Sequence, residues 1–385
     1  GEGEGGGGEG EGEGGGPPAT ALALGVGVGF GCAIDSNGHV QCWGANGSGQ
    51  LGRADTTSQI GNRAEVVPGL SNVTRLAVAQ SHACAAGDFG GVTTVVCWGD
   101  NTEGNLGSAS GGLSAGDLVV PDVDLNILRD VDAIAADGDN NGDITCLHGG
   151  GETWCFGEQM PGYLPGHFAV RVSVLDAATE LYDSLHAICG RIGSDAICTD
   201  TDTFAQGLGC TDGQPCPLLD ATSFAFSDDF FCNTDDANTT RCLGENTFGV
   251  VSPASAGGGF TLTLTAVPGA GGTTVSAGTQ HACVVGTDAV VRCWGRDLFF
   301  STGRAPTDSA LDDCNDAAND PSGITFCQAP EPVPMPPGFQ AFTDVVTRAT
   351  GSCAREVGGR VVCWGDLLTV GDQTGEAAVE IPLAP

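Results

Sequence analysis

Residues 32–52 of the chain read CAIDSNGHVQCWGANGSGQLG, and this stretch decides the fold. Two cysteines enclose a polar centre, and a tryptophan and a glycine directly follow the second cysteine. Polar residues midway between two strand-forming stretches predict a β-hairpin whose loop is residues 36–38, with Gly38 in the left-handed conformation. Because residues opposed across a hairpin lie close together, we expect Cys32 and Cys42 to form a disulfide that staples the two strands.

The same cysteine pairing recurs along the whole chain. Fourteen of the 18 cysteines form seven short-range pairs, and four of these pairs are ten residues apart. The pairs are Cys32/Cys42, Cys84/Cys97, Cys146/Cys155, Cys189/Cys198, Cys232/Cys242, Cys283/Cys293 and Cys353/Cys363. A feature that repeats about every fifty residues describes an architecture rather than an active site.

Each complete repeat holds further strand candidates before its hairpin. An apolar run at residues 73–79 precedes the second hairpin, and a proline-containing stretch at residues 64–70 precedes that run. Four strands per unit and seven units predict an all-β fold, a seven-bladed β-propeller of four-stranded blades over residues 19–385. The first repeat lacks its proline-containing strand, which residues 378–383 resemble. We therefore expect the C-terminal strand to complete the first blade and close the ring.

Four cysteines stand outside the repeats, in two long interruptions at residues 200–225 and 296–340. We expect Cys210 and Cys216, and Cys314 and Cys327, to pair locally and pin these two loops. An even number of regularly spaced cysteines predicts a disulfide framework, which persists in oxidising compartments. Zinc binding is the rival interpretation, but it favours closely spaced cysteine ligands, and the chain has no Cys-x-x-Cys motif.

Composition restricts the partners and the compartment. The formal net charge of the 385 residues is −35, and all 13 basic residues are arginine. Such a surface repels nucleic acid and anionic membranes, so we expect no nucleic-acid partner. No apolar stretch approaches the length of a transmembrane helix. The chain begins without a methionine or an export signal, which we interpret as a mature, secreted form.

The repeats resemble those of the regulator of chromosome condensation family, which are seven-bladed propellers. Residues 42–52, CWGANGSGQLG, and 97–107, CWGDNTEGNLG, carry the resemblance, together with SHACA at 81–85 and QHACV at 280–284. Repeats three to five depart from this pattern, since two lack the tryptophan and the fourth, at residues 198–200, reads CTD.

The resemblance implies the fold of residues 21–385 more than it implies a function. The eukaryotic namesake is a nucleotide exchange factor of a small GTPase and contacts chromatin, roles that the acidic charge and the disulfides here disfavour. The cysteine-paired repeats are similar to secreted bacterial members, one of which, of the β-lactamase inhibitor type, is a binding protein and not an enzyme.

The best candidate for a local site is the acidic stretch DGDNNGD at residues 137–143. Oxygen-bearing residues at Asp137, Asp139 and Asn141, a glycine at the sixth position and Asp143 match the start of a calcium-binding loop. The twelfth position is His148 where such a loop has a bidentate glutamate, so an acidic hairpin turn without a metal remains the alternative. A second acidic cluster surrounds Cys314, at Asp312, Asp313, Asp316 and Asp320. Calcium is the one cofactor that the sequence suggests, and none is required by the fold.

We find no catalytic residues in the sequence and expect no enzymatic activity. No nucleophile elbow and no phosphate-binding loop occurs. His82 and His281 occupy equivalent repeat positions, which favours packing roles, and the five tryptophans should fill spaces between blades. Sequons at Asn46, Asn72 and Asn238 could accept glycans.

Two functional hypotheses remain for a chain of this kind. The first is an extracellular structural or interaction protein whose Gly/Glu-rich tail, residues 1–18, docks on another copy and gives a fibre or surface homopolymer. The second is a secreted binding module, such as an inhibitor, adhesin or receptor, that uses the loops at 200–225 and 296–340. A glycan-active enzyme is the remote third.

Overall fold

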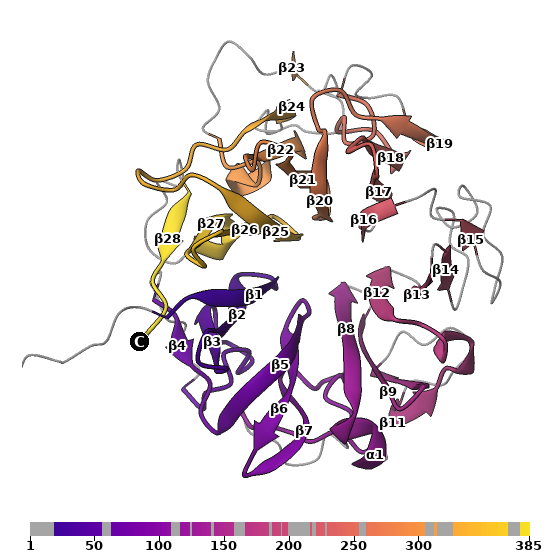
Figure 1. The fold of residues 1–385 in the computed structure, drawn as a ribbon, viewed down its shortest axis with the longest axis vertical. Coiled ribbons are helices and arrows are strands. Elements are labelled where there is room, and N and C mark those ends of the chain that lie inside the picture. Colours follow the sequence, from indigo (N-terminus) through magenta and orange to yellow (C-terminus); the bar gives the residue numbers. More distant parts are fainter. Residues whose placement is uncertain are drawn as a thin grey trace, which may run out of the picture.

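Seven small antiparallel sheets surround a central axis in the computed structural model of the chain (Figure 1). The arrangement confirms the predicted seven-bladed β-propeller. The tail at residues 1–18 lies outside the described residues. The structure describes residues 19–55, 63–108, 116–123, 125–139, 142–157, 166–184, 187–193, 195–198, 216–217, 221–227, 229–253, 259–304, 312–313, 326–368 and 378–385.

The sheets are the blades, numbered one to seven in chain order. Blade one contains β1 (Ala21–Val26), β2 (Phe30–Asp35), β3 (Val40–Gly44) and β4 (Glu65–Val66). Blade two contains β5 (Leu70–Val78), β6 (His82–Phe89) and β7 (Val92–Gly99), and Val119 adds a single bridge to its rim. Blade three contains β8 (Val131–Asp139), β9 (Gly142–Gly149), β10 (Glu152–Gly157) and β11 (Gly166–Arg171).

The remaining four blades follow the same order. Blade four contains β12 (Glu180–Ser184), β13 (Ala187–Ile192), β14 (Asp195–Cys198) and β15 (Cys216–Pro217). Blade five contains β16 (Ala221–Phe226), β17 (Phe230–Asp235), β18 (Thr240–Glu245) and β19 (Phe260–Ala266). Blade six contains β20 (Gly272–Ala277), β21 (His281–Gly286), β22 (Val291–Arg296), β24 (Phe326–Pro332) and, outside it, β23 (Asp312–Asp313). Blade seven contains β25 (Phe342–Arg348), β26 (Gly351–Glu356), β27 (Val361–Gly365) and β28 (Val379–Ile381).

In the described residues, helical structure is confined to short connections. These are α1 (Leu125–Arg129) and the 3-10 turns η1 (Ser173–Leu175), η3 (Leu298–Phe300) and η4 (Asp366–Leu368).

The first strand of each blade lines the axis. These strands contact one another in the order β1, β5, β8, β12, β16, β20 and β25, and β25 contacts β1 again. The second strand of a blade is covered on both faces by neighbouring blades, and every residue of β2 and β21 is buried. A strand buried on both faces favours apolar or small residues along its length, which is why these segments show no alternation of apolar and polar residues; their one large polar residue, Asp35 in β2 and His281 in β21, lies at a strand end.

The C-terminal strand does not complete the first blade, contrary to the prediction from the sequence. β28 pairs with β27 inside blade seven, and β4, which lies two residues before Pro68, pairs with β3 of the preceding hairpin. Each described blade is therefore continuous in sequence, with its last strand at the rim. A proline beside such a strand is tolerated because a sheet edge needs no N–H for a further ladder.

The ring closes through the same blade-to-blade contact that joins other blades. In blades two, six and seven a backbone N–H at the start of the inner segment donates to the hairpin turn of the blade before it. These bonds are Val73 to Gly38 (2.9 Å), Gly272 to Asn238 (3.1 Å) and Phe342 to Ala289 (2.9 Å). At the closure, the Ala21 N–H donates to the Gly359 carbonyl at 2.7 Å.

The four accepting turn residues all have positive φ, which turns their carbonyls toward the next blade. Gly38, with a φ of 77°, has the left-handed conformation predicted for the first hairpin.

A side-chain clamp adds to the closure. The fully buried Gln41 in β3 donates from Nε2 to the Ala384 carbonyl at 2.9 Å and accepts the Ala384 N–H at 2.7 Å. Gln41 also donates to Asp35 at 2.7 Å, which holds the amide in place. The last residues of blade seven are thereby attached to blade one without an exchange of strands.

Candidate functional site

The centres of the blades hold the disulfides predicted from the repeat. Six staples join directly opposed residues: Cys32–Cys42, Cys84–Cys97, Cys146–Cys155, Cys232–Cys242, Cys283–Cys293 and Cys353–Cys363. In blade four the strand register places the disulfide-bonded Cys189 opposite Cys198. All of the staples in the six blades are fully buried. Buried disulfides in such number indicate an oxidising environment.

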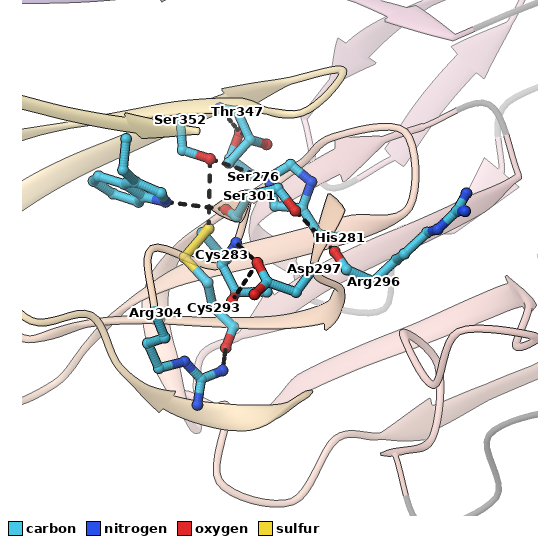
Figure 2. Close-up of a disulfide and its surroundings, with 12 residues drawn as sticks. Ser276, His281, Cys283, Cys293, Arg296, Asp297, Ser301, Arg304, Thr347 and Ser352 are labelled. Atoms are coloured by element: carbon cyan, nitrogen blue, oxygen red, sulfur yellow. Dashed lines mark hydrogen bonds between the residues drawn. A yellow bond between two sulfur atoms is a disulfide. The ribbon is translucent and has the colours of Figure 1, made fainter. Parts of the chain in front are cut away.

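The staple of blade six shows how a blade is joined to its neighbour (Figure 2). His281, two residues before Cys283, contacts Ser352 of blade seven, with 3.0 Å between Nε2 and Oγ. The Ser352 hydroxyl also lies 4.0 Å from the sulfur of Cys283. Beside this contact, the hydroxyls of Ser276 and Thr347 are 3.0 Å apart. The interface between the two blades is therefore a small buried network of neutral polar groups.

Burial decides the charge of the histidine in this network. His281 is 1% exposed, and desolvation lowers its pKa from 6.5 to about 4. The imidazole is thus neutral at pH 7. The matching contact between blades two and three is 2.7 Å from His82 Nε2 to Thr145 Oγ1, and Thr145 donates onward to the Asn105 carbonyl at 3.0 Å. Both histidines join neighbouring blades, a more specific role than the packing role expected from their repeat positions.

At two other blade interfaces, the equivalent contact is made by apolar residues. Phe30 in blade one and Phe230 in blade five stand at the position that is histidine in blades two and six. In the blade that follows each of them, the residue before the first staple cysteine is alanine instead of serine or threonine. Phe30 shares a buried cluster with Ala83, and Phe230 shares one with Ala282. The repeat therefore uses two matched pairs, histidine with a hydroxyl and phenylalanine with alanine.

Three tryptophans that directly follow a staple cysteine form hydrogen bonds to the preceding blade. Their indole N–H groups donate to carbonyls in the loop of the blade before: Trp98 to Gln50 (3.0 Å), Trp294 to Val250 (2.8 Å) and Trp364 to Ser301 (3.0 Å). Trp154 differs, because it precedes its cysteine and lies half-buried against Glu152. The expected role passes there to the buried Phe156.

The loop that follows the CWG-type sequence is organised by an amide side chain in blades one, two and five. The Oδ1 atom of Asn101 accepts the Leu106 N–H at 3.0 Å, and Asn46 and Asn246 do the same for their loops. In blade six this position is Asp297, whose Oδ1 accepts from both the N–H and the hydroxyl of Thr302 at 2.9 Å. Burial raises the pKa of Asp297, because desolvation disfavours the charged form of its carboxyl group. The amides at the same position in other repeats are neutral and carry no such cost.

The role of Asn46 also corrects one glycosylation expectation. Its side chain is fully buried, and both amide atoms are bonded within the loop, so it cannot accept a glycan. The sequon residues Asn72 and Asn238 are exposed.

The candidate calcium stretch forms the end of the β8–β9 hairpin. Asp137 and Asp139 lie in β8, and Asp143 pairs with Gly138 from β9. Asn141 lies outside the described residues, as do the side chains of the other three. The calcium site stays a prediction. In the described part of the chain, no group of three or more histidine, cysteine or acidic residues is placed to hold a metal.

The two long loops are described only in part. β15 places Cys216 at the rim of blade four, opposite Ala196, while Cys210 lies outside the described residues. β23 adds an extra strand to blade six, in which Asp313 pairs with Phe326. Cys327 lies opposite Asp312, and Cys314 lies outside the described residues, so the pairing of Cys314 with Cys327 stays a prediction. Asp316 and Asp320 lie outside the described residues.

Two features of the structure could not be foreseen from the repeats. Arg348 of β25 donates from Nη2 to the Ala136 carbonyl of β8 at 3.2 Å, a contact from blade seven to blade three across the axis. In η3, Phe299 and Phe300 have φ values of 53° and 60°, and the Phe299 side chain is 57% exposed.

The repeat itself shows that this backbone is unusual. Phe300 stands where three other repeats have a glycine of positive φ, at Gly49, Gly104 and Gly249. Bulky side chains rarely adopt this conformation.

The complete ring is similar to known propellers. Prp20p from Saccharomyces cerevisiae matches with 16% sequence identity and a TM-score of 0.69, over 90% of this chain and 86% of its own. Human WBSCR16 matches with 13% identity and a TM-score of 0.69, over 90% and 94% of the two chains. The chain has the fold of RCC1-like propellers.

A third solved structure extends the likeness to a receptor. The ectodomain of the Arabidopsis thaliana receptor kinase ACR4 matches with 15% identity and a TM-score of 0.50, over 95% of this chain and 99% of that domain. No family model and no curated protein matches the sequence. At these identities the likeness establishes the fold and leaves the function to the chain's own residues.

Proposed function

We propose that the chain is a non-enzymatic extracellular interaction protein, a disulfide-stapled propeller whose copies assemble through the N-terminal segment 1–18. The observation that carries the proposal is the fully buried disulfide at the centre of six blades. A loop of about ten residues closed by a disulfide contributes roughly 2–3 kcal/mol of stability. A protein that depends on several such bonds is suited to a compartment outside the cytosol.

The chemistry of the blade interfaces supports a binding role over catalysis. His82 and His281 are buried between blades and occupied with hydroxyl groups. A general base must reach a substrate, and neither imidazole has access to solvent. In the part of the chain that is described, no helix is long and apolar enough to cross a membrane.

Composition supports the role of the tail. Residues 1–18 contain eleven glycines, five glutamates and two prolines, and no apolar side chain that could build a core of its own. Such a segment gains order only by docking on another surface. Docking on a second copy is a head-to-tail contact, which generates an open filament when its rotation does not close. Prp20p, with the same fold, has been described with its binding to Gsp1p and histones, which shows that such a ring can serve protein binding.

Deletion of residues 1–18 tests the assembly. We expect the full chain to form large assemblies in sedimentation velocity and electron microscopy, and the form lacking residues 1–18 to remain small. A control in which the five glutamates become glutamine keeps the length of the tail. It distinguishes the effect of the tail's charge on assembly from the effect of removing the tail. Assemblies that form equally well without the tail would overturn the proposed polymer.

A second candidate function is ligand binding by the loop at residues 296–340, and the strained η3 turn favours it. Phe299 and Phe300 both have a left-handed backbone, and at the position of Phe300 three other repeats have a glycine. Strain of this kind costs about 1–3 kcal/mol and concentrates at functional sites. An exposed Phe299 at the start of the loop offers an apolar contact for a protein ligand.

Replacement of the exposed ring tests this candidate. Phe299→Ser should weaken the capture of a binding partner in a pull-down from the culture medium, whereas the matched change Val357→Ser, at an exposed turn of blade seven, should not. Equal capture by the two variants and the unchanged protein would exclude the η3 turn as the binding element. A variant without the loop at 200–225 separates the contributions of the two loops.

A further inference from the structure

Trp154 is the tryptophan that the scaffold of the ring does not use. The other four tryptophans directly follow a staple cysteine and are at most 1% exposed, whereas Trp154 precedes Cys155 and is only partly buried. Phe156 takes the scaffold position in blade three. Within the described residues, no second aromatic ring and no guanidinium packs on the indole of Trp154, and none of the buried apolar clusters includes it. The faces of this ring therefore fill no space that the repeat requires to be filled.

Charged side chains surround the indole at the rim of blade three, where β11 is the outermost strand (Figure 1). Glu152 lies two residues before Trp154 in β10, and Arg171 of β11 lies directly opposite Trp154, so the three side chains share one face of the sheet. The indole N–H donates to Glu152 Oε2 at 3.2 Å, and Glu152 Oε1 lies 2.9 Å from Arg171 Nη1. Arg171 also donates from Nη2 to Asp176 Oδ2 at 2.7 Å. An indole, a guanidinium and two carboxylates are thereby held in fixed orientations beside one another.

The stability of the ring does not account for this group. The side chains of Arg171 and Glu152 are 45% and 36% exposed, and ion pairs between exposed side chains contribute little to stability. The exposed part of the indole of Trp154 is likewise not buried in any core. An aromatic surface beside a few oriented polar groups is the composition of a ligand site.

The chemistry of the group matches a neutral carbohydrate. A pyranose ring has a face of C–H groups that packs on an indole, and hydroxyl groups at its edge that both donate and accept hydrogen bonds. Arg171 supplies N–H donors in a planar fork, and the oxygens of Glu152 and Asp176 have further lone pairs that accept from hydroxyl groups. A cationic side chain fits less well, because Arg171 already neutralises these carboxylates. The net charge of −35 repels anionic ligands.

We propose that Trp154, Glu152, Arg171 and Asp176 form a binding site for a neutral carbohydrate on blade three. A sugar ring packs on the indole, and its hydroxyl groups bond to the guanidinium and the carboxylates. The site goes beyond the proposed assembly, since it uses neither the tail at residues 1–18 nor the loop that follows η3.

Titration of the full chain with the methyl glycosides of glucose, galactose, mannose, xylose and N-acetylglucosamine tests the site. Because the other four tryptophans are buried, a saturable change of tryptophan fluorescence on addition of a glycoside reports on Trp154. We expect such a change with at least one of these glycosides. Glucuronic acid should bind more weakly than methyl glucoside, because its carboxylate is repelled by the acidic protein.

Calorimetric titration of variants with the glycoside that binds best assigns the site to its residues. Trp154→Ala and Arg171→Ala should each weaken binding by about tenfold or more, and Trp154→Phe, which keeps an aromatic face, should weaken it less. The matched control is Arg241→Ala, which removes an ion pair with Asp235 at the strand position of blade five that corresponds to Trp154, and it should leave the affinity unchanged. Thermal unfolding of each variant verifies that the ring is intact.

Three results would overturn the proposed site. The first is a full chain that binds none of the glycosides, and the second is equal affinity of the unchanged protein and the Trp154→Ala and Arg171→Ala variants. The third is a preference for an arginine-rich peptide over the glycosides that is lost in Trp154→Ala, which would assign the surface to protein ligands. Glycoside binding should be the same with and without residues 1–18, so failure of the tail hypothesis and failure of this one are distinguished.

Discussion

The residue two positions before the first cysteine of a repeat is matched to a residue of the following blade. His281 meets Ser352 and His82 meets Thr145, each in a fully buried contact. Where the repeat has phenylalanine instead, the next blade supplies alanine. A buried serine or threonine hydroxyl without a hydrogen-bond partner lowers stability, whereas the methyl group of an alanine at the same position does not. This explains why a hydroxyl accompanies histidine and alanine accompanies phenylalanine.

Exchange of one pair for the other tests this matching. His281→Phe alone should lower the free energy of unfolding by about 1–3 kcal/mol, because it leaves the Ser352 hydroxyl buried without its partner. The double variant His281→Phe/Ser352→Ala should recover most of the loss, since it recreates the pair used by Phe230 and Ala282. Denaturant unfolding of the single and double variants gives the coupling energy, and strictly additive effects would contradict the matching.

The neutral histidine also makes stability depend on pH. The pKa of His281 is lowered from 6.5 to about 4, so between these values the unfolded chain takes up a proton that the folded chain excludes. Stability from this group is therefore present above pH 6.5 and is lost as the pH falls toward 4. The double variant should lose less stability over that interval than the unchanged protein.

Asp297 gives a pH dependence of the opposite sign. Its pKa is raised above 3.8 by burial, so the folded chain keeps the proton longer, and stability falls as the pH rises through this range. Asp297→Asn restores the amide found at Asn46, Asn101 and Asn246 and should raise the free energy of unfolding at pH 7 by about 1 kcal/mol. The gain should shrink at pH 3. A variant that is less stable than the unchanged protein at pH 7 would show that attraction to Arg304 outweighs desolvation.

At the scale of elements, the hairpins follow directly from the sequence and the rim strands do not. The spacing of Cys32 and Cys42 determines which residues face each other, because the register of a hairpin is local. The proline-containing stretch lies only a few residues before the next inner strand, with β4 ending at Val66 and β5 beginning at Leu70. Its closeness in sequence to β5 predicts that this stretch belongs to the following blade, whereas its hydrogen bonds to β3 place β4 in the preceding blade. The closing strand was misassigned for the same reason.

The Gln41 clamp is the element that replaces strand exchange at the closure. Gln41→Ala removes both hydrogen bonds to Ala384 and should increase hydrogen exchange in β28 and at the start of β1, because the end of blade seven loses its attachment to blade one. Arg292→Ala changes the equivalent position of blade six, where the side chain bonds to Asp288 of its own blade, and should leave exchange in β28 unchanged. Equal protection of β28 in both variants would show that the clamp does not hold the closure.

At the scale of the whole molecule, the regular parts form the scaffold, and the binding surfaces that we propose lie in the irregular parts. The repeats predicted the ring and the staples, since the staples depend on short-range spacing and the ring on the number of repeats. The contact of Arg348 with Ala136 joins residues 212 positions apart in sequence, so no repeat pattern could indicate it. The position of β19 at the rim of blade five became evident only from the order of strands in its sheet. The candidate sites that rest on residues 137–143 and on the tail are still predictions.

Disulfide mapping of the native protein tests the central claim most directly. Digestion without reduction, followed by mass spectrometry, identifies which cysteine peptides are linked. We expect seven hairpin pairs, from Cys32–Cys42 to Cys353–Cys363, two local pairs in the loops at 200–225 and 296–340, and no reactive thiol after denaturation. Linkages between different blades, or several free thiols in the native protein, would contradict a stapled propeller made for an oxidising environment.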